Sequence, residues 1–459
     1  MNVLFLNLPS NYIREGRCQQ KKSTRATFLP PLSLAYAASL LRDDGFKVQL
    51  LDCAALKMNP DGLRINCQSF QPDLVILSTS TPSADEDLEI IGEIKSWLKV
   101  PVAALGPHAT ACDEELLNGG LDIVVRGEPA HTCLEVARHL GSPELKEVQG
   151  ISFINNETLV RNPPRPFIKD LDSLPFPARD LLPNQEYRHV VSGRPFTMIQ
   201  TSRGCPNQCI FCVSSQIYGH ALRQRSVSSV IGEIQEVQKR FGINDIYFFA
   251  DTFTLDRSFV LDLCQEITRH KLGISWWTNS RVDCLDDEML GWMRRAGCET
   301  MGLGYESASQ EILDRSRKGI SIEHSRRAAE MCRKAGIEVF GFFVFGLPGE
   351  TRKTINETVR FARKLDPDFA DFFPAVPYPG TELFEILNSE ELIVDRKWSH
   401  YEYSSCVIRT KDMNAFQLRA RIAAAYGEFY LRPSPMRRVW RKTSPLGLVK
   451  AGFRYLLNR

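Results

Sequence analysis

The first part of the chain alternates short apolar runs with stretches of helical periodicity. The runs are rich in Val, Ile and Leu and cover Val3–Leu8, Phe46–Leu51, Leu74–Ser78, Val102–Leu105 and Ile123–Val125. Helical patterns separate them at Leu32–Asp44, Asp85–Leu98, Asp113–Asn118 and Ala130–Leu140. Continuous apolar runs are typical of strands buried on both faces, so residues 1–140 are predicted to form a doubly wound α/β sheet. Ligands of such a sheet bind beyond the carboxyl ends of its strands.

Residues 141–195 interrupt this alternation, and a second series follows over residues 196–385. The interruption contains Asn162-Pro-Pro-Arg-Pro166 and is predicted to be an extended linker. Candidate strands of the second series are Phe196–Thr201, Asp245–Ala250, Ser275–Thr278, Thr300–Tyr305, Val339–Phe345 and Phe369–Val376. Six strands with helical crossovers fit an open α/β sheet or a partial barrel, and both place chemistry at the carboxyl strand ends. Residues 386–459 are basic and predicted to be helical.

Composition narrows the class of protein. A length of 459 residues fits two or three domains, and 57 Lys and Arg against 55 Asp and Glu predict no general affinity for nucleic acid. We find no apolar run long enough to span a bilayer and no signal-peptide pattern, so an intracellular, cytoplasmic location is expected. In a reducing compartment the 13 cysteines are expected to be thiols.

The strongest chemical signal is a cluster of three cysteines after the first strand of the second series. Cys205, Cys209 and Cys212 lie in Cys-Pro-Asn-Gln-Cys-Ile-Phe-Cys. Three thiolates fit an iron–sulfur cluster with one open iron. A structural zinc site, with His220 as a fourth ligand, and cysteines without a ligand are the alternatives from spacing alone.

Together with later motifs, these cysteines resemble those of the radical S-adenosylmethionine (SAM) superfamily. The matching segments are Thr201–Cys212, Phe248–Phe253, Gly302–Ser307, Gly341–Glu350 and Pro377–Glu382. The resemblance implies a partial (β/α)6 barrel with a [4Fe–4S] cluster held by Cys205, Cys209 and Cys212. It also implies SAM contacts at Phe211, Asp251, Asn279, Ser280, Arg281, Glu306 and Gly346. Tyr378 is the candidate catalytic residue.

Several of these residues have a purely structural alternative. Asp251 could instead be a helix N-cap, and Glu306 could form a buried salt bridge. Arg281 is a candidate partner for the SAM carboxylate because its planar guanidinium suits bidentate bonding.

The first domain resembles the cobalamin-binding domain fused to one large subgroup of these enzymes. The resemblance lies in three loops at predicted strand ends, and it implies cobalamin contacts at Ser78, Thr79, Ser80, Gly106, Pro107, His108, Arg126, Gly127 and Glu128. Ala104 and Leu105 stand where related proteins often have Gly-Gly, and the motif that supplies a histidine to cobalt elsewhere is absent. His108 could instead be a loop histidine bonded to backbone, and Arg126 and Glu128 could simply pair with each other.

The resemblance implies radical cleavage of SAM and cobalamin-dependent methylation of an unactivated carbon in a small-molecule, lipid or tetrapyrrole substrate. Oxidative cyclisation or ring rearrangement without methyl transfer, as in the anaerobic porphyrin cyclases, is the alternative. A non-catalytic cobalamin or iron–sulfur sensor is an alternative of another class. An external donor of flavodoxin or ferredoxin type is expected to supply electrons.

The basic C-terminal segment suggests a surface for peripheral membrane contact or delivery of a lipid-like substrate. Its notable residues are Arg437, Arg438, Trp440, Arg441, Lys442 and Phe453. A solvated helical cap on the barrel is the alternative.

Overall fold

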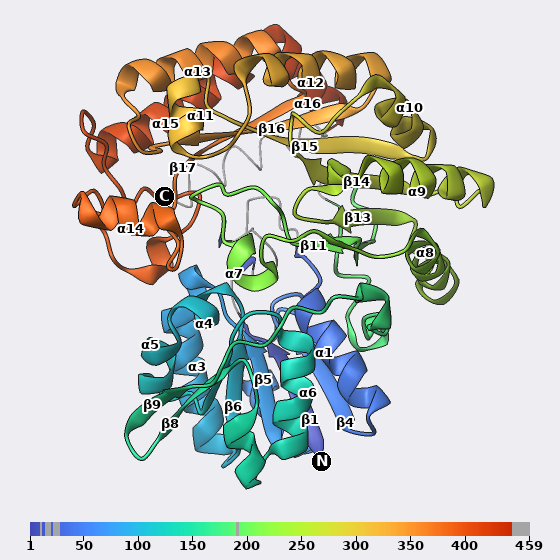
Figure 1. The fold of residues 1–459 in the computed structure, drawn as a ribbon, viewed down its shortest axis with the longest axis vertical. Helices are drawn as coiled ribbons and strands as arrows, with labels where there is room; N and C mark the ends of the chain where they lie inside the picture. Colours follow the sequence, from blue (N-terminus) through green and yellow to red (C-terminus); the bar gives the residue numbers. More distant parts are fainter. Residues whose placement is uncertain (10–11, 14–19, 22–27, 190–191, 443–459) are drawn as a thin grey trace.

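The chain folds into two α/β units, each built on its own sheet (Figure 1). The computed structural model describes residues 1–9, 12–13, 20–21, 28–189 and 192–442, with the backbone alone for 12–13, 20–21 and 439–442. The predicted α/β class, with a doubly wound sheet followed by an open barrel of parallel strands, is confirmed. Phe453 lies outside the described residues, as do the side chains of Trp440, Arg441 and Lys442.

The first unit is a seven-stranded sheet in the order β4-β1-β5-β6-β7-β8-β9. Its parallel strands are β1 (Asn2–Asn7), β4 (Lys47–Asp52), β5 (Leu74–Ser78), β6 (Val102–Leu105) and β7 (Ile123–Val125). Helices α1 (Leu32–Asp43) and α6 (Pro129–His139) cover one face, and α2 (Pro60–Phe70), α3 (Ala84–Trp97) and α5 (Asp113–Asn118) cover the other. The strand order reverses between β1 and β5, where a sheet of this type opens a crevice for ligands.

A β-hairpin that the sequence pattern did not predict extends this sheet. β8 (Ile151–Asn155) pairs antiparallel with β7, and β9 (Thr158–Arg161) pairs with β8. The two residues between them, Asn156 and Glu157, have φ values of +48° and +64°. Two central residues at positive φ match the right-handed twist of a two-residue hairpin. The first part of the predicted linker therefore continues the first sheet.

The second unit is a six-stranded parallel sheet whose strands follow chain order. They are β10 (Phe196–Gln200), β13 (Asp245–Phe249), β14 (Ser275–Ser280), β15 (Cys298–Glu306), β16 (Glu338–Phe345) and β17 (Phe369–Pro374). Helices α8 (Val227–Phe241), α9 (Arg257–Arg269), α10 (Asp287–Arg295), α12 (Ile322–Ala335) and α13 (Arg352–Leu365) pack on the convex face. On the concave face, β10 and β13 share a core with the first unit, so the two units are packed together.

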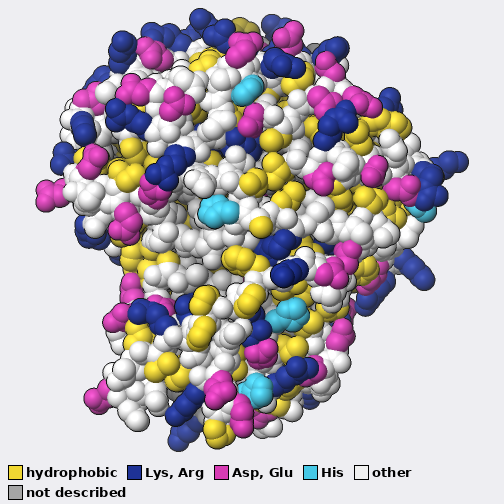
Figure 2. All heavy atoms as spheres, viewed as in Figure 1, with side chains coloured by type: hydrophobic (Ala, Val, Ile, Leu, Met, Phe, Trp, Pro, Cys, Tyr) yellow, Lys and Arg dark blue, Asp and Glu magenta, His cyan; other side chains and the backbone are white. Residues whose placement is uncertain are grey.

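The C-terminal region is helical only in part. Helix α14 (Glu382–Ser389) precedes residues 390–414, which contain the 3-10 turn η6 (Trp398–His400) and no described α-helix. Helices α15 (Ala415–Tyr430) and α16 (Pro433–Lys442) follow. None of the described helices combines the length and apolar content needed to cross a bilayer. On the face shown in Figure 2, Lys and Arg side chains are interspersed with Asp and Glu.

Helix α15 also protects the edge of the barrel sheet. The Tyr430 hydroxyl donates to Ala370 O at 2.8 Å and accepts from Ala370 N at 2.9 Å. The Tyr426 hydroxyl accepts from Phe372 N at 3.2 Å. Two phenols thus satisfy the backbone groups of Ala370 and the N–H of Phe372 on β17, which is the last strand of this sheet among the described residues.

Candidate functional site

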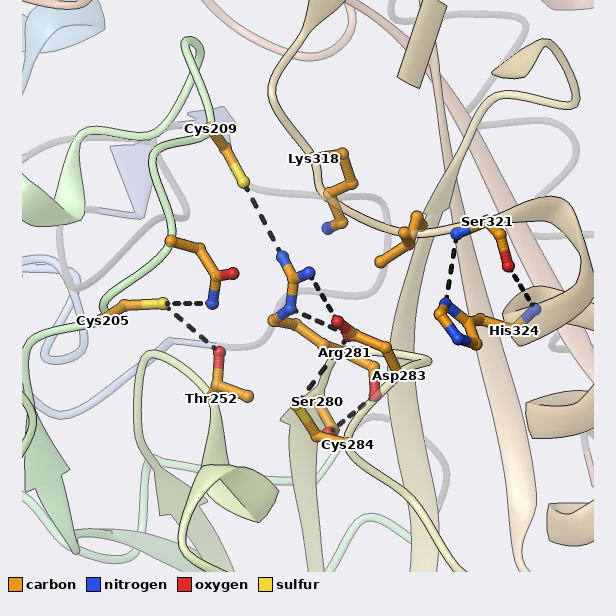
Figure 3. Close-up of polar contacts among 12 residues, drawn as sticks. Cys205, Cys209, Thr252, Ser280, Arg281, Asp283, Cys284, Lys318, Ser321 and His324 are labelled. Atoms are coloured by element: carbon orange, nitrogen blue, oxygen red, sulfur yellow. Dashed lines mark hydrogen bonds and ion pairs between the residues drawn. The ribbon is translucent and has the colours of Figure 1, made fainter. Parts of the chain in front are cut away.

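The three cysteines lie on the loop that follows the first barrel strand. Cys205, Cys209 and Cys212 are half-buried thiols between β11 (Ser202–Arg203) and α7 (Ser214–Tyr218). Gly204 begins the loop at φ +84°, where an added Cβ would lie 2.1 Å from Ala221 O, so a larger residue would displace the backbone. Figure 3 shows the Cys205 and Cys209 side chains on two sides of one space, bordered by Thr252 and Arg281.

Two cationic side chains border the cysteine loop. Arg281 Nη1 lies 3.9 Å from Cys209 Sγ, and Lys318 Nζ lies 6.0 Å from the ring centroid of Phe211. Arg281 also bonds Asp283 with two contacts of 2.9 Å, so a second carboxylate would have to share this guanidinium.

Glu306 is a buried partner of Lys318. Their ion pair measures 2.6 Å, as in the structural alternative raised for Glu306. Glu306 has φ +59°, a backbone conformation that residues other than glycine rarely adopt. The pair lies over Gly304, where an added Cβ would come within 2.4 Å of Glu306 Oε1. The end of β15 is therefore built around this carboxylate, and its contact with the SAM ribose stays a prediction.

Asp251 connects the two ends of the cysteine loop. Its carboxylate accepts from Gly204 N at 2.9 Å and from the hydroxyl of Ser214, which begins α7. The N-cap alternative for Asp251 is wrong, because Asp256 caps α9 by accepting from Phe259 N at 3.0 Å. Asp251 holds the loop in place, and a contact with the SAM amine stays a prediction.

A cavity lies between helix α7 and three loops of the first unit, which follow β5, β6 and β7. It is lined by small and apolar residues that include Ser78, Gly106, Pro107, Gly127, Val213, Ser214, Ile217 and Tyr218. Gly106 has φ +123°, and an added Cβ would lie 2.3 Å from Thr79 O. The lining fits a large flat cofactor because the loops carry little side-chain volume at the carboxyl strand ends. Four residues predicted to contact cobalamin thus meet helix α7, which follows the cysteines.

Other residues predicted to contact cobalamin face elsewhere. Thr79 Oγ1 donates to Asp87 Oδ2 at 2.8 Å, and Ser80 belongs to the turn that starts α3. His108 is 1% exposed and does not line the cavity; its ring packs edge-on against Trp398, with centroids 5.3 Å apart. Burial lowers the pKa of His108 to about 4. The proposed backbone bond of His108 is wrong, since neither ring nitrogen has a partner among the described residues.

Glu128 forms a buried ionic cluster with two arginines of the second unit. It bonds Arg203 and Arg223, each at 2.8 Å, and accepts from Ile168 N at 2.8 Å. The pairing of Arg126 with Glu128 is therefore wrong; Arg126 donates instead to Ile151 O at 3.0 Å and to Asn162 O. The sequence pattern missed this cluster, because its members lie 75 and 95 residues apart along the chain.

The remaining predicted site residues occupy the carboxyl ends of later strands. Asn279 donates to the Tyr247 hydroxyl at 2.8 Å, and Ser280 bonds Thr254. Gly346 N donates to Glu350 Oε2 at 2.5 Å. Tyr378 is buried in the loop after β17, where its carbonyl accepts from Thr381 Oγ1 at 2.6 Å. These residues lie at the end of the sheet that carries the cysteine loop, but no substrate contact of Tyr378 is established.

Comparison with known proteins agrees with this arrangement. Residues 199–362 match the radical SAM superfamily, and residues 22–137 match the B12 binding domain. The chain is 37% identical over 409 residues to an uncharacterized methyltransferase of Pyrococcus horikoshii, with 88% of each chain covered. The chain belongs to the cobalamin-dependent radical SAM methyltransferase family.

Two further comparisons agree with this family membership. The chain is 27% identical to the anaerobic magnesium-protoporphyrin IX monomethyl ester cyclase of Cereibacter sphaeroides, covering 92% of this chain and 71% of the relative. The solved structure of the radical SAM methyltransferase TsrM from Kitasatospora setae, with cobalamin and a [4Fe–4S] cluster bound, shares the fold with a TM-score of 0.71 at 19% identity. That match covers 95% of this chain and 90% of TsrM.

Family membership establishes the chain as an enzyme with SAM, a [4Fe–4S] cluster and cobalamin as its cofactors. The zinc alternative for the cysteine motif and the sensor alternative are thereby set aside. The chain's own geometry fits these cofactors, since it offers three half-buried thiols on one loop next to a cavity with small walls.

Proposed function

We propose that this cobalamin-dependent radical SAM enzyme methylates an unactivated carbon of an apolar small molecule, such as a lipid or a tetrapyrrole. The observation that carries the proposal is an aromatic wall on the concave face of the barrel, formed by Phe340, Phe342, Phe373 and Tyr403. These side chains are half-buried, whereas the alternate residues of β16 are packed under the outer helices. Ring centroids of Phe373 and Tyr403 are 4.6 Å apart, and those of Phe340 and Phe342 are 5.3 Å apart.

The strand next to the aromatic wall places two glycines beside its rings. Gly302 and Gly304 of β15 pair in register with Phe340 and Phe342. An added Cβ at Gly302 would lie 2.9 Å from Phe342 and 2.2 Å from Asn279 Oδ1. A wall of rings beside two glycines suits a flat or apolar ligand, because rings bury much apolar area with defined geometry.

Different residues of the chain would have different roles in the reaction. Cys205, Cys209 and Cys212 would hold the cluster, and Arg281 and Lys318 place positive charge beside it. The aromatic wall would orient the substrate and exclude water from the reacting carbon. When bound, the three cofactors supply reductive cleavage of SAM and a transferable methyl group.

Anaerobic product analysis tests the proposal. The protein is loaded with iron, sulfide and cobalamin, reduced, and incubated with SAM and a panel holding a triterpene, a protoporphyrin and a nucleotide. We expect 5′-deoxyadenosine, S-adenosylhomocysteine and a methylated apolar product. Cys205→Ala should lose all three, while Cys284→Ala, outside the cysteine motif, should keep them. Methylation of the nucleotide alone would contradict the apolar substrate class.

Oxidative cyclisation is the second candidate, because the chain also aligns with cyclases over most of its length. The anaerobic cyclase of Rubrivivax gelatinosus is 28% identical over 444 residues, covering 94% of this chain. The aromatic wall would accept the flat macrocycle that those enzymes are named for. Under this hypothesis the same assay yields 5′-deoxyadenosine without S-adenosylhomocysteine, and the porphyrin gains a ring without gaining a methyl group.

The expected partners are inferred from the chemistry of the proposed reaction and not from a contact in the structure. A small acidic donor of the flavodoxin or ferredoxin type would supply the electron that SAM cleavage consumes. Peripheral membrane contact through the C-terminal region would suit a lipid-like substrate. Arg438 does not support this membrane contact, because it bonds Asp366 at 2.9 Å and is not available to a lipid headgroup.

A further inference from the structure

Three side chains with metal-binding chemistry gather behind the cobalamin loop, away from the cysteine motif. They are His108 on α4 (Pro107–Ala111), Cys112 at the junction of α4 with α5, and Glu115 on α5. One ligand atom of each lies within 4.8 Å of the others. Cys112 has φ −125° and ψ 42°, which breaks the helix between α4 and α5, so the three side chains come together where these two short helices meet.

Among these three residues, His108 is buried without the hydrogen bonds that its ring nitrogens need from the described part of the chain. It is 1% exposed, and both ring nitrogens lack a hydrogen-bond partner among the described residues. Buried polar atoms are almost always paired, so two unpaired nitrogens on one ring call for a partner of another kind. A neutral imidazole nitrogen is a common metal ligand.

Neighbouring side chains orient two members of this group. Trp398 on η6 donates from Nε1 to Glu115 Oε1 at 2.7 Å, which orients the carboxylate, and its ring packs edge-on against His108. Asp113 is not available as a ligand, since it is bonded to Arg161 at 2.8 Å and to Ser152 at 2.6 Å. Ligands held by outer partners in this way are a regular feature of metal sites.

We propose that His108, Cys112 and Glu115 form a Zn²⁺ site, with water as the fourth ligand. An imidazole nitrogen, a thiolate and a carboxylate are all ligands of zinc, and the mixture suits it better than Mg²⁺ or Ca²⁺. Tetrahedral coordination needs ligand atoms roughly 3.5 Å apart, so small side-chain rotations would close the site. Zinc replaces the Cys112 thiol proton, which leaves to solvent, and the metal–sulfur bond forms with no change in oxidation state.

The proposed zinc would connect two parts of the chain far apart in sequence. Through Glu115 and Trp398 it would fasten the helix that opens after Gly106 to the segment after α14. The site would therefore position the wall of the cobalamin cavity rather than take part in the reaction.

Zinc binding to the full chain with its cluster already loaded tests the proposal. The loaded protein is dialysed against a chelator and titrated with Zn²⁺ under a competing chromophoric chelator, and its zinc is examined by X-ray absorption. We expect one tightly bound zinc with one sulfur and the rest nitrogen or oxygen ligands. Cys112→Ser should weaken zinc binding at least tenfold and remove the sulfur contribution, while the matched control Cys284→Ser should do neither.

Two more variants keep the outcome decisive. Glu115→Gln keeps the shape of the site and should weaken zinc binding less than Cys112→Ser. A variant that lacks Cys205, Cys209 and Cys212 should still bind this zinc, which separates the site from the cluster ligands. The proposal is overturned if the cluster-loaded chain binds zinc no more tightly than Cys112→Ser, or if the zinc–sulfur signal disappears with the three cluster cysteines.

Discussion

Glu128 of the first unit and Arg203 of the second form an ion pair of 2.8 Å in which both side chains are almost fully buried. Arg203 stands two residues before Cys205, and its guanidinium also lies 5.3 Å from the ring centroid of Tyr36 on α1. The carboxylate that follows β7 is thus bound to the base of the cysteine loop. The relative placement of the cobalamin cavity and the cluster ligands depends on this contact.

Removing the charge of Glu128 should destabilise the protein strongly. Glu128→Gln leaves Arg203 and Arg223 buried without their counter-charge, and breaking such a group costs about 3–5 kcal/mol. Urea unfolding should report this loss in the free energy of unfolding. The control is Glu311→Gln, whose partner Arg315 is exposed and whose loss should change stability by less than about 0.5 kcal/mol. Equal effects of the two variants would contradict a structural role for the cluster.

Asp251→Asn should reduce iron retention more than it reduces stability. An amide accepts with its oxygen alone, so the bond to the Ser214 hydroxyl must reverse its direction, and both contacts lose the carboxylate charge that holds the ends of the cysteine loop. We expect lower iron and sulfide content after anaerobic reconstitution, with the far-ultraviolet circular dichroism unchanged. Asp256→Asn, at the N-cap of α9, provides the comparison and should keep its iron. Full iron content in Asp251→Asn would rule out the bracing role.

Gly106→Ala should impair cobalamin binding. The added methyl would lie 2.3 Å from Thr79 O, at a backbone φ of +123° that alanine rarely adopts, so the loop must move. We expect cobalamin affinity to fall at least tenfold in an equilibrium titration. Gly92→Ala on α3 is the matched control, because its added methyl meets no atom within 4 Å and should leave affinity unchanged. If both variants bind cobalamin equally, this loop is not part of the site.

Glu350 should make stability depend on pH. Burial raises the pKa of its carboxyl from 4.5 to about 8, so between these values unfolding releases a proton. The free energy of unfolding should therefore fall as the pH rises through this range, by roughly 5 kcal/mol in full. Glu350→Gln cannot titrate and should flatten this part of the profile in urea unfolding at pH 5, 6.5 and 8. Exposed Glu323→Gln should leave the slope intact; parallel profiles for all three proteins would refute the assignment.

The sequence pattern predicted the sheets well because parallel strands are buried on both faces and read as uninterrupted apolar runs. It missed the β8–β9 hairpin, since Pro163 and Pro164 follow at once and the turn at Asn156 and Glu157 has no glycine. Spacing singled out the three cysteines as candidate ligands because they lie close together along the chain. It assigned the wrong partner to Glu128, because long-range pairing with Arg203 and Arg223 leaves no local trace.

The two phenols of α15 have a consequence beyond the barrel itself. An uncovered parallel edge strand offers its backbone to any other extended chain, and this is a common start of aggregation. Because Tyr426 and Tyr430 occupy Phe372 N and the backbone of Ala370, the last strand offers few sites to an incoming strand. Docking of helix α15 therefore limits aggregation during synthesis. Until this helix docks, strand β17 of the nascent barrel can pair with strands from neighbouring chains.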